Sequence, residues 1–325
     1  MANVQAWIDE RCRELDGERV ATRSSRLRVL KRELHSPADV PEASLAACDG
    51  FAISAAASAG ASAYSPLPFV PGPDGPPGMA AAVPVESGAP MPGGADAVVP
   101  AEDCDVTGAF IEVTRAVAAG ENVRGAGTEA RAGDVIAAGG RRLRAADLAL
   151  FSLAGIDAVE VVRRPRVLIA CVAPQGEDHD SAMIEALVGD NGGTVGALHH
   201  CDRRRGALEE SLTTSEADLT IVVGGTGAGD NDFVVDALAA VGEVAMHGIA
   251  LRPGESAALG PAGGRPVIAL PGIPLACMVA ADFLVARAVR RLAGLGGDWP
   301  YPCRRGDAGA QDPPRARGGS RSPGS

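Results

Sequence analysis

Short apolar runs and amphipathic stretches alternate regularly along the second half of the chain. Runs typical of buried strands occur at 164–173, 194–200, 217–225, 242–251 and 265–272. Stretches with helical spacing of apolar residues occur at 179–193, 204–215, 231–241 and 274–295. Because buried strands that alternate with helices form βαβ units, this half predicts an α/β fold of three layers, with a mainly parallel sheet covered on both faces.

The first half of the chain has a different pattern. Residues 1 to about 35 show a helical spacing of apolar residues, including Val4, Trp7, Ile8, Cys12 and Leu15. From 36 to 94 the chain is rich in Ala, Gly, Pro and Ser, which excludes long helices and favours short strands and turns. Segments 95–100 and 109–117 predict strands, and 143–156 predicts a helix that Gly155 ends. Residues 296–325 are too poor in apolar side chains to order themselves and predict a disordered tail.

Composition narrows the class of protein. The 325 residues hold 30 Lys and Arg against 41 Asp and Glu, a formal charge of −11. This charge disfavours binding to nucleic acid or to an anionic membrane surface. No apolar stretch reaches the roughly 18 residues of a membrane span, and the charged N-terminal segment lacks a signal core, so we expect a cytoplasmic protein. Seven scattered cysteines without a CxxC pair disfavour a disulfide framework or a structural zinc site.

In parallel sheets ligands bind beyond the carboxyl ends of the strands, and two loops there are candidates. The first follows the strand at 217–225, and its glycines predict an anion cradle or, alternatively, only a tight strand-to-helix turn. Its candidate binding residues are Gly224, Gly225, Thr226, Gly227 and Gly229. Asp230 either joins this site or caps the following helix, and Asp232 is a candidate for Mg²⁺ or for amino groups of a heterocycle. The second loop carries Pro271 and Pro274, which either shape a binding loop or simply begin a helix.

A third group of polar residues gives a weaker signal. His199, His200, Cys201 and Asp202 are four consecutive candidate metal ligands. Because consecutive side chains of a strand point to opposite faces, they cannot all meet one ion. We therefore do not predict a metal site from this run.

Six motifs in order carry a resemblance to a known family. They are CDGFAI (48–53), SGAPMPGGADAVVPAED (87–103), GENVRGAGTEARAGDVI (120–136), GGTGAGDNDF (224–233), ALRPG (250–254) and LPGIPLA (270–276). Together they span about residues 40–295 and resemble the molybdopterin molybdenumtransferase family, which includes bacterial MoeA and the E domain of gephyrin. The resemblance implies molybdenum cofactor biosynthesis, with molybdate inserted into adenylated molybdopterin, AMP released and Mg²⁺ assisting.

The resemblance also implies an architecture. Residues 1–45 and 125–162 correspond to an N-terminal helical or linker domain, 46–124 to a small β-rich domain, and 163–295 to the molybdopterin-binding α/β domain. The family's C-terminal barrel has no counterpart, since 296–325 is predicted to be disordered. The family site lies between two subunits, which implies a homodimer or a heterodimer with a full-length relative.

Individual residues can be carried over from the motifs. Asp49 matches the aspartate of the family's DG[YF]A motif, Ser87 replaces a threonine, and Asp202 fits an aspartate after the domain's second strand. The resemblance implies catalytic roles for Asp49, Asp202 and Asp232, metal binding by Asp49 and Asp232, and substrate binding by the glycine loop and by Ser87, Arg252, Pro271 and Pro274.

The chain also departs from the family pattern. The STGDEL segment reads CVAPQGEDHDS, in which Glu177 or Asp178 is the candidate replacement acid. A lysine-rich stretch has become Gly248, Arg252 and Glu255, and the Asn of LPGNP is Ile273. These changes remove positive charge near a polyanionic substrate. An alternative function is therefore a non-catalytic paralogue that binds molybdopterin or the finished cofactor as a scaffold or carrier.

Overall fold

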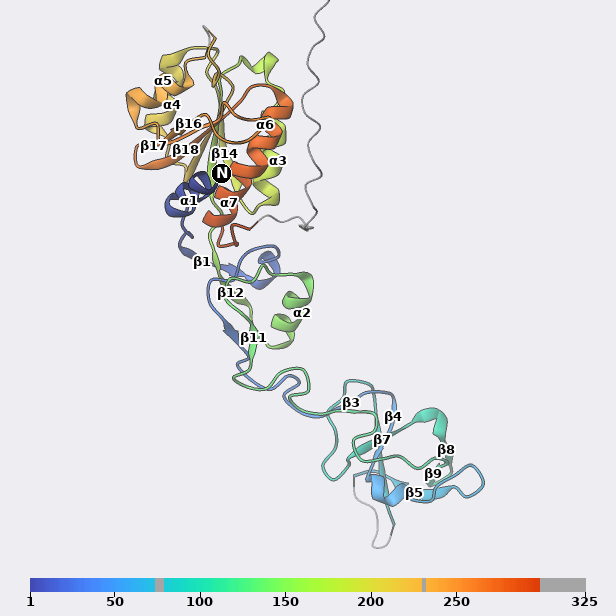
Figure 1. Ribbon diagram of the computed structural model, residues 1–325. Coiled ribbons are helices and arrows are strands. Elements are labelled where there is room, and N and C mark those ends of the chain that lie inside the picture. Colours follow the sequence, from blue (N-terminus) through green and yellow to red (C-terminus); the bar gives the residue numbers. More distant parts are fainter. Residues whose placement is uncertain (74–78, 230–231, 299–325) are drawn as a thin grey trace, which may run out of the picture.

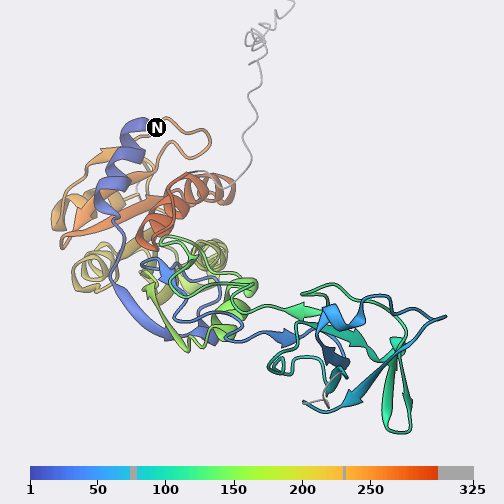
Figure 2. The same cartoon turned by 90° about the horizontal axis from the view of Figure 1, so that it is seen from below.

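The computed structural model describes residues 1–73, 79–229 and 232–298. The chain forms an elongated molecule of three units (Figure 1). An α/β unit occupies one end and a small β-rich unit the other, and a linking unit lies between them in both views (Figures 1 and 2). Among the described residues no helix has the length and apolar character needed to cross a membrane.

The α/β unit is built on a six-stranded sheet of order β14-β13-β15-β18-β17-β16. Its strands are β13 (Arg166–Cys171), β14 (Thr194–His200), β15 (Leu219–Val223), β16 (Met246–His247), β17 (Ala258–Ala262) and β18 (Arg265–Leu270). The first four strands in that order are parallel, which confirms the predicted α/β class, and β17 and β16 are antiparallel. The strand predicted at 242–251 shrinks to β16, and β17 was not predicted because Gly260 and Pro261 interrupt its apolar pattern.

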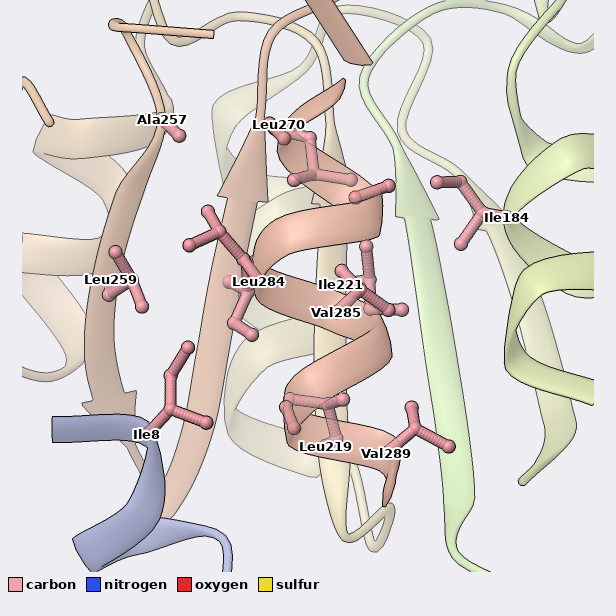
Figure 3. Packing of buried hydrophobic residues seen from close by; sticks show 14 of the residues in the cluster. Ile8, Ile184, Leu219, Ile221, Ala257, Leu259, Leu270, Leu284, Val285 and Val289 are labelled. Carbon is pink, nitrogen blue, oxygen red and sulfur yellow. The ribbon is translucent and has the colours of Figure 1, made fainter. Parts of the chain in front are cut away.

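Helices cover both faces of this sheet. One face carries α3 (Ser181–Asp190), α6 (Pro274–Ala280), a π-helical turn η5 (Ala281–Val285) and α7 (Ala286–Leu292). The other carries α4 (Arg205–Thr214) and α5 (Val234–Val241). Figure 3 shows Leu284 and Val285 packing over Ile221 of the central strand. The two aliphatic cores hold the carboxyl ends of β13, β15 and β18 at one edge.

The N-terminal helix differs from its prediction. A helical pattern was expected to about residue 35 in the linking domain, but α1 (Ala2–Arg11) ends early and joins the α/β core through Val4, Ile8 and Cys12. Asp9 makes a two-bond ion pair with Arg287 of α7, at 2.6 and 3.0 Å. The apolar stripe of α1 is too short to form a separate core, so it is buried against the larger unit.

The linking unit is where the chain leaves the α/β unit and returns to it. Strand β1 (Gly17–Ala21) pairs antiparallel with β12 (Ala158–Val162), and β2 (Leu34–His35) pairs with β11 (Val135–Ala137). Helix α2 (Ala145–Leu153) covers these strands, and Phe151 is fully buried among them. Gly155, with φ +68°, follows the end of this helix as predicted. A 3₁₀ turn, η1 (Thr22–Ser24), follows β1.

The small unit is a six-stranded sheet of order β7-β4-β6-β5-β9-β8. Its strands are β4 (Gly50–Ile53), β5 (Leu67–Pro71), β6 (Ala81–Val85), β7 (Ala97–Pro100), β8 (Cys104–Thr107) and β9 (Phe110–Val113). Two 3₁₀ turns, η2 (Ala55–Ser58) and η3 (Ala101–Asp103), connect them, and β3 (Leu45–Ala46) pairs with β10 (Val123–Arg124) where the unit joins the rest. Of the tail predicted at 296–325, residues 299–325 lie outside the described residues.

Candidate functional site

A cavity of about 210 Å³ opens at the carboxyl ends of β13, β15 and β18. This is the edge of the sheet where the sequence predicts ligand binding. The described residues that line the cavity are Cys171, Val172, Ala173, Glu177, Asp178, His179, Asp180, Arg203, Val223, Gly224, Gly225, Asp232, Gly272 and Pro274.

The loop after β15 and the loop after β18 meet at this cavity, with their backbones in close contact. The N–H of Gly224 donates a hydrogen bond of 3.0 Å to the carbonyl of Leu270. A Cβ on Gly272 would lie 3.1 Å from the Cα of Gly224. Gly224 also has φ +88°, a conformation that side chains disfavour. The glycines in both loops are therefore needed for this close backbone approach.

Asp232 closes the glycine loop on itself. Its Oδ2 accepts a hydrogen bond of 2.7 Å from the N–H of Gly229, and a Cβ on Gly227 would lie 2.7 Å from the same oxygen. Helix α5 begins only at Val234, so the loop does not run directly into it as expected. Asp230, the other candidate acid, lies outside the described residues. The loop thus presents the carboxylate of Asp232 to the cavity. The N–H of Gly229 holds this carboxylate in place and is no longer free to bind a ligand.

Thr226 faces the protein interior. Its side chain is 2% exposed, and its hydroxyl lies 3.0 Å from the hydroxyl of Ser256. Its carbonyl lies 3.2 Å from Nε2 of His247. These contacts make Thr226 an anchor of the loop and leave its hydroxyl turned away from the cavity, which Thr226 does not line.

The cavity is strongly acidic. Four carboxylates line it, from Glu177, Asp178, Asp180 and Asp232. Arg203, which also lines it, is bound to Glu177 in an ion pair. Burial raises the pKa of Asp180, and the nearby charge of Asp178 raises it further. The site therefore favours a cation at the cavity more than a bare anion.

Hydrogen bonds fix Asp178 in this group. Its Oδ1 accepts the N–H groups of Asp180 and Ser181 at 3.1 and 3.0 Å, at the start of α3. Burial alone would raise its pKa, but the hydrogen bonds from Ser181 and from the backbone hold the pKa of Asp178 below its usual range. Asp178 is thus an ionised, oriented carboxylate. Of the two replacement acids named from the sequence, it is the less exposed.

Of four other candidates, one lines the cavity and three do not. Asp202 is exposed, has φ +48° and lies 3.7 Å from Arg204. Arg252 has 88% of its side chain exposed and pairs with Glu255 at 3.7 Å, so the glutamate that replaces a lysine neutralises it. Neither Asp202 nor Arg252 is among the described residues that line the cavity. Pro271 is buried, and Pro274 begins α6 and does line the cavity.

Asp49 and Ser87 form a separate pair in the small unit. The N–H of Ser87 donates a hydrogen bond of 2.7 Å to Oδ1 of Asp49, and both residues are exposed. The small unit lies at the opposite end of the molecule from the α/β unit in both views (Figures 1 and 2), and the cavity belongs to the α/β unit. One chain therefore does not bring Asp49 to Asp232.

Sequence reasoning missed Arg203 and Asp180 as cavity residues. Arg203 lies three residues after the end of the strand at 194–200. Its φ is +54°, and its backbone N–H donates a hydrogen bond of 2.7 Å to the carbonyl of Val172. The position of Arg203 after a strand end was a usable signal. No such signal marked Asp180, because the segment between β13 and α3 departs from the STGDEL motif of the family.

Comparison with known proteins agrees with this architecture. Residues 1–155 match the family model described as "MoeA N-terminal region (domain I and II)", and 160–291 match "Probable molybdopterin binding domain". The chain is 27% identical to molybdopterin molybdenumtransferase 2 of Mycobacterium tuberculosis, over 82% of this chain and 73% of that protein. It is 28% identical to molybdopterin molybdenumtransferase of Staphylococcus aureus, over 85% of this chain and 71% of that protein.

A solved structure shares the same arrangement. The crystal structure of a molybdopterin biosynthesis MoeA protein from Pyrococcus horikoshii superposes with a TM-score of 0.68, at 26% identity, over 89% of this chain and 80% of that one. The two family models together match nearly all of the described chain, in the order that the six motifs predicted. The chain therefore belongs to the MoeA family, with the N-terminal region of that family followed by its molybdopterin-binding domain.

Proposed function

We propose that this protein is a molybdopterin molybdenumtransferase, which inserts molybdate into adenylated molybdopterin in the cytoplasm. The observation that carries the proposal is the cavity at the carboxyl edge of a molybdopterin-binding domain, with the glycine loop and Asp232 on one side and Pro274 on the other. The named relatives are molybdenumtransferases. The six described cysteines are all free, which suits a reducing compartment.

The acidic lining fits Mg²⁺, which prefers carboxylate oxygens. Asp180 and Asp232 would hold the ion, and Asp232 is already oriented by its hydrogen bond with Gly229. Bound Mg²⁺ supplies positive charge that offsets the charge of the substrate phosphates. The chain's own contribution is positional: the glycine loop allows a close backbone approach, and Arg203 offers one guanidinium.

We further propose that the working site needs two chains. Asp49 and Asp232 lie in units at opposite ends of one chain, so a site that uses both must take the partner subunit's Asp49. Oligomers with two-fold symmetry build two equal sites in this way. A homodimer is the simplest arrangement, and a heterodimer with a full-length relative is the alternative.

The direct test is AMP release from adenylated molybdopterin in the presence of Mg²⁺ and molybdate. We expect Asp232→Asn to slow release by about 10²-fold or more, since the variant loses a charged group at the reacting centre. Asp236→Asn is the matched control, because Asp236 is an exposed acid four residues further along, in α5, and is not among the described residues that line the cavity. An Asp232→Asn protein as active as the control would overturn the role given to Asp232.

Mixing two inactive variants tests the shared site. Asp49→Asn and Asp232→Asn chains should each be inactive alone. Random dimers of the two would restore about a quarter of normal activity, because half are mixed and each mixed dimer holds one intact site. Absence of any restored activity, with mixed dimers verified by mass spectrometry, would contradict a site built from two chains.

The carrier function has its own support. Arg252 is neutralised by Glu255, and four carboxylates face the cavity, so a free polyanion is poorly attracted. Tight binding of molybdopterin without AMP release in the wild-type protein would favour the scaffold or carrier over the enzyme. Failure to bind molybdopterin at all would exclude both.

A further inference from the structure

Three side chains that no motif connects converge at one end of the cavity. Cys171, Asp178 and His200 each offer one ligand atom, and these atoms all lie within 4.8 Å of one another. Cys171 ends strand β13, Asp178 precedes helix α3, and His200 ends strand β14. Cys171 and Asp178 line the cavity itself.

The register of the sheet brings Cys171 and His200 together. Strands β13 and β14 are parallel neighbours, and Cys171 lies directly opposite His200 in their pairing. Paired residues of adjacent strands point to the same face of a sheet. Cys201, one residue further along, belongs to the core on the other face. The run of four candidate ligands at 199–202 therefore contributes only His200, and its partners come from other parts of the chain.

One polar atom of this group, on His200, has no partner in the described part of the protein. Nδ1 of His200 is buried and has no hydrogen-bond partner among the described residues. It lies 3.9 Å from Oδ2 of Asp178, beyond hydrogen-bond distance. The other oxygen of Asp178 is occupied by the two N–H groups at the start of α3, so Oδ2 is the one left to face His200. An unpaired buried nitrogen is destabilising, and a ligand between the two groups would give it a partner.

We propose that Cys171, Asp178 and His200 bind a thiophilic divalent metal ion of the Zn²⁺ class. Sulfur, nitrogen and oxygen ligands of a tetrahedral Zn²⁺ lie about 3.3–3.7 Å apart, so closure around an ion needs movements of about 1 Å or less. Three protein ligands leave a fourth position open, and the cavity lined by Cys171 and Asp178 lies beside it.

This site differs in chemistry from the Mg²⁺ site proposed above. Mg²⁺ takes oxygen ligands in octahedral geometry, whereas a thiolate and an imidazole select Zn²⁺ or Co²⁺. The two sites share the cavity but no ligand, since Asp180 and Asp232 hold the first and Cys171, Asp178 and His200 the second. Binding at the second site is measurable whether or not the protein releases AMP.

Cobalt titration of the full-length, metal-stripped protein tests the proposal. Co²⁺ should produce a near-ultraviolet thiolate-to-cobalt charge-transfer band, which Zn²⁺ removes and excess Mg²⁺ does not. Cys171→Ser should abolish the band. His200→Gln should weaken Co²⁺ binding by about a hundredfold or more, because even the loss of a group behind a metal ligand costs about 10- to 100-fold. Asp178→Asn should weaken it likewise while keeping the side-chain oxygen that caps α3.

The matched control is Cys201→Ser. Cys201 is a buried cysteine beside His200 on the opposite face, so its replacement should leave the band unchanged. Absence of a band in the wild-type protein would overturn the proposal. Retention of the band in Cys171→Ser or unweakened binding in His200→Gln would do the same, provided that circular dichroism shows each variant folded.

Discussion

Gly50 of the DGFA motif gives the sharpest prediction about the small unit. This residue begins β4 and is buried, paired with both β6 and β7. A Cβ at this position would lie 2.0 Å from the carbonyl oxygen of Val99 and 3.1 Å from the Cα of Pro100. Both are backbone atoms, so no side chain can move aside. Gly50→Ala must therefore push β4 and β7 apart.

The cost follows from what this separation disrupts. Separating the strand ends breaks about two ladder hydrogen bonds, worth about 1–3 kcal/mol together. Overpacking of the buried sheet adds about 1–3 kcal/mol. The total, about 2–6 kcal/mol, is a large share of the stability of a small domain. Asp49 is the next residue, so its hydrogen bond with Ser87 should loosen as well.

Hydrogen exchange measured by mass spectrometry can localise this effect. Peptides covering β4, β6 and β7 should exchange about thirtyfold faster or more in Gly50→Ala, since each 1.4 kcal/mol of local stability is a factor of about ten. Peptides of the α/β sheet should not change, because the described residues of the two units belong to separate core clusters. Gly93→Ala is the control: a Cβ at Gly93 meets nothing within 4 Å. Equal exchange in the two variants would refute the steric explanation of the motif glycine.

Three further predictions concern the α/β unit. Asp9→Asn removes the charge that binds Arg287 through two hydrogen bonds, so it should lower the free energy of unfolding in urea by about 1 kcal/mol. An unchanged unfolding midpoint would show that α1 is held by its apolar face alone. Ile273 is the N-cap of α6 and provides no side-chain cap, so Ile273→Asn should raise the unfolding free energy by about 0.5–1 kcal/mol, whereas Ile273→Ala should not. Burial alone would raise the pKa of Asp218, but its two hydrogen bonds with Arg163 hold that pKa below the usual range. The stability that this carboxylate adds is therefore present above the ordinary pKa of about 3.9 and is lost as the pH falls through the lower, folded-state pKa, so Asp218→Asn should lose about 1–2 kcal/mol at neutral pH and progressively less as the pH falls through that folded-state pKa.

The acidity of the cavity changes how the overall charge is understood. A charge of −11 disfavours anionic partners in general, and the structure places part of that charge, from four carboxylates, where an anionic substrate is expected. Bound cations would reverse the local sign. The proposed function and the proposed metal site therefore both require positive charge that is supplied from outside the chain.

The sequence by itself determined the local elements of the α/β unit and their order. Segment 194–200 is β14, and 204–215 differs from α4 by one residue at each end, because apolar periodicity and burial agree there. The family was also readable, since backbone geometry at the ligand edge restricts which residues can stand there. Gly272 is one such residue, as its close contact with Gly224 shows.

Tertiary structure alone decided how distant residues combine. The pattern of α1 did not show that Val4 and Ile8 would join the core of a unit that starts more than 150 residues later. The sequence of the four residues 199–202 also did not show that only His200 would lie beside Cys171. Strand register depends on the packing of the whole sheet. Periodicity encodes which side of an element is apolar, but the partner of each side is set by long-range packing.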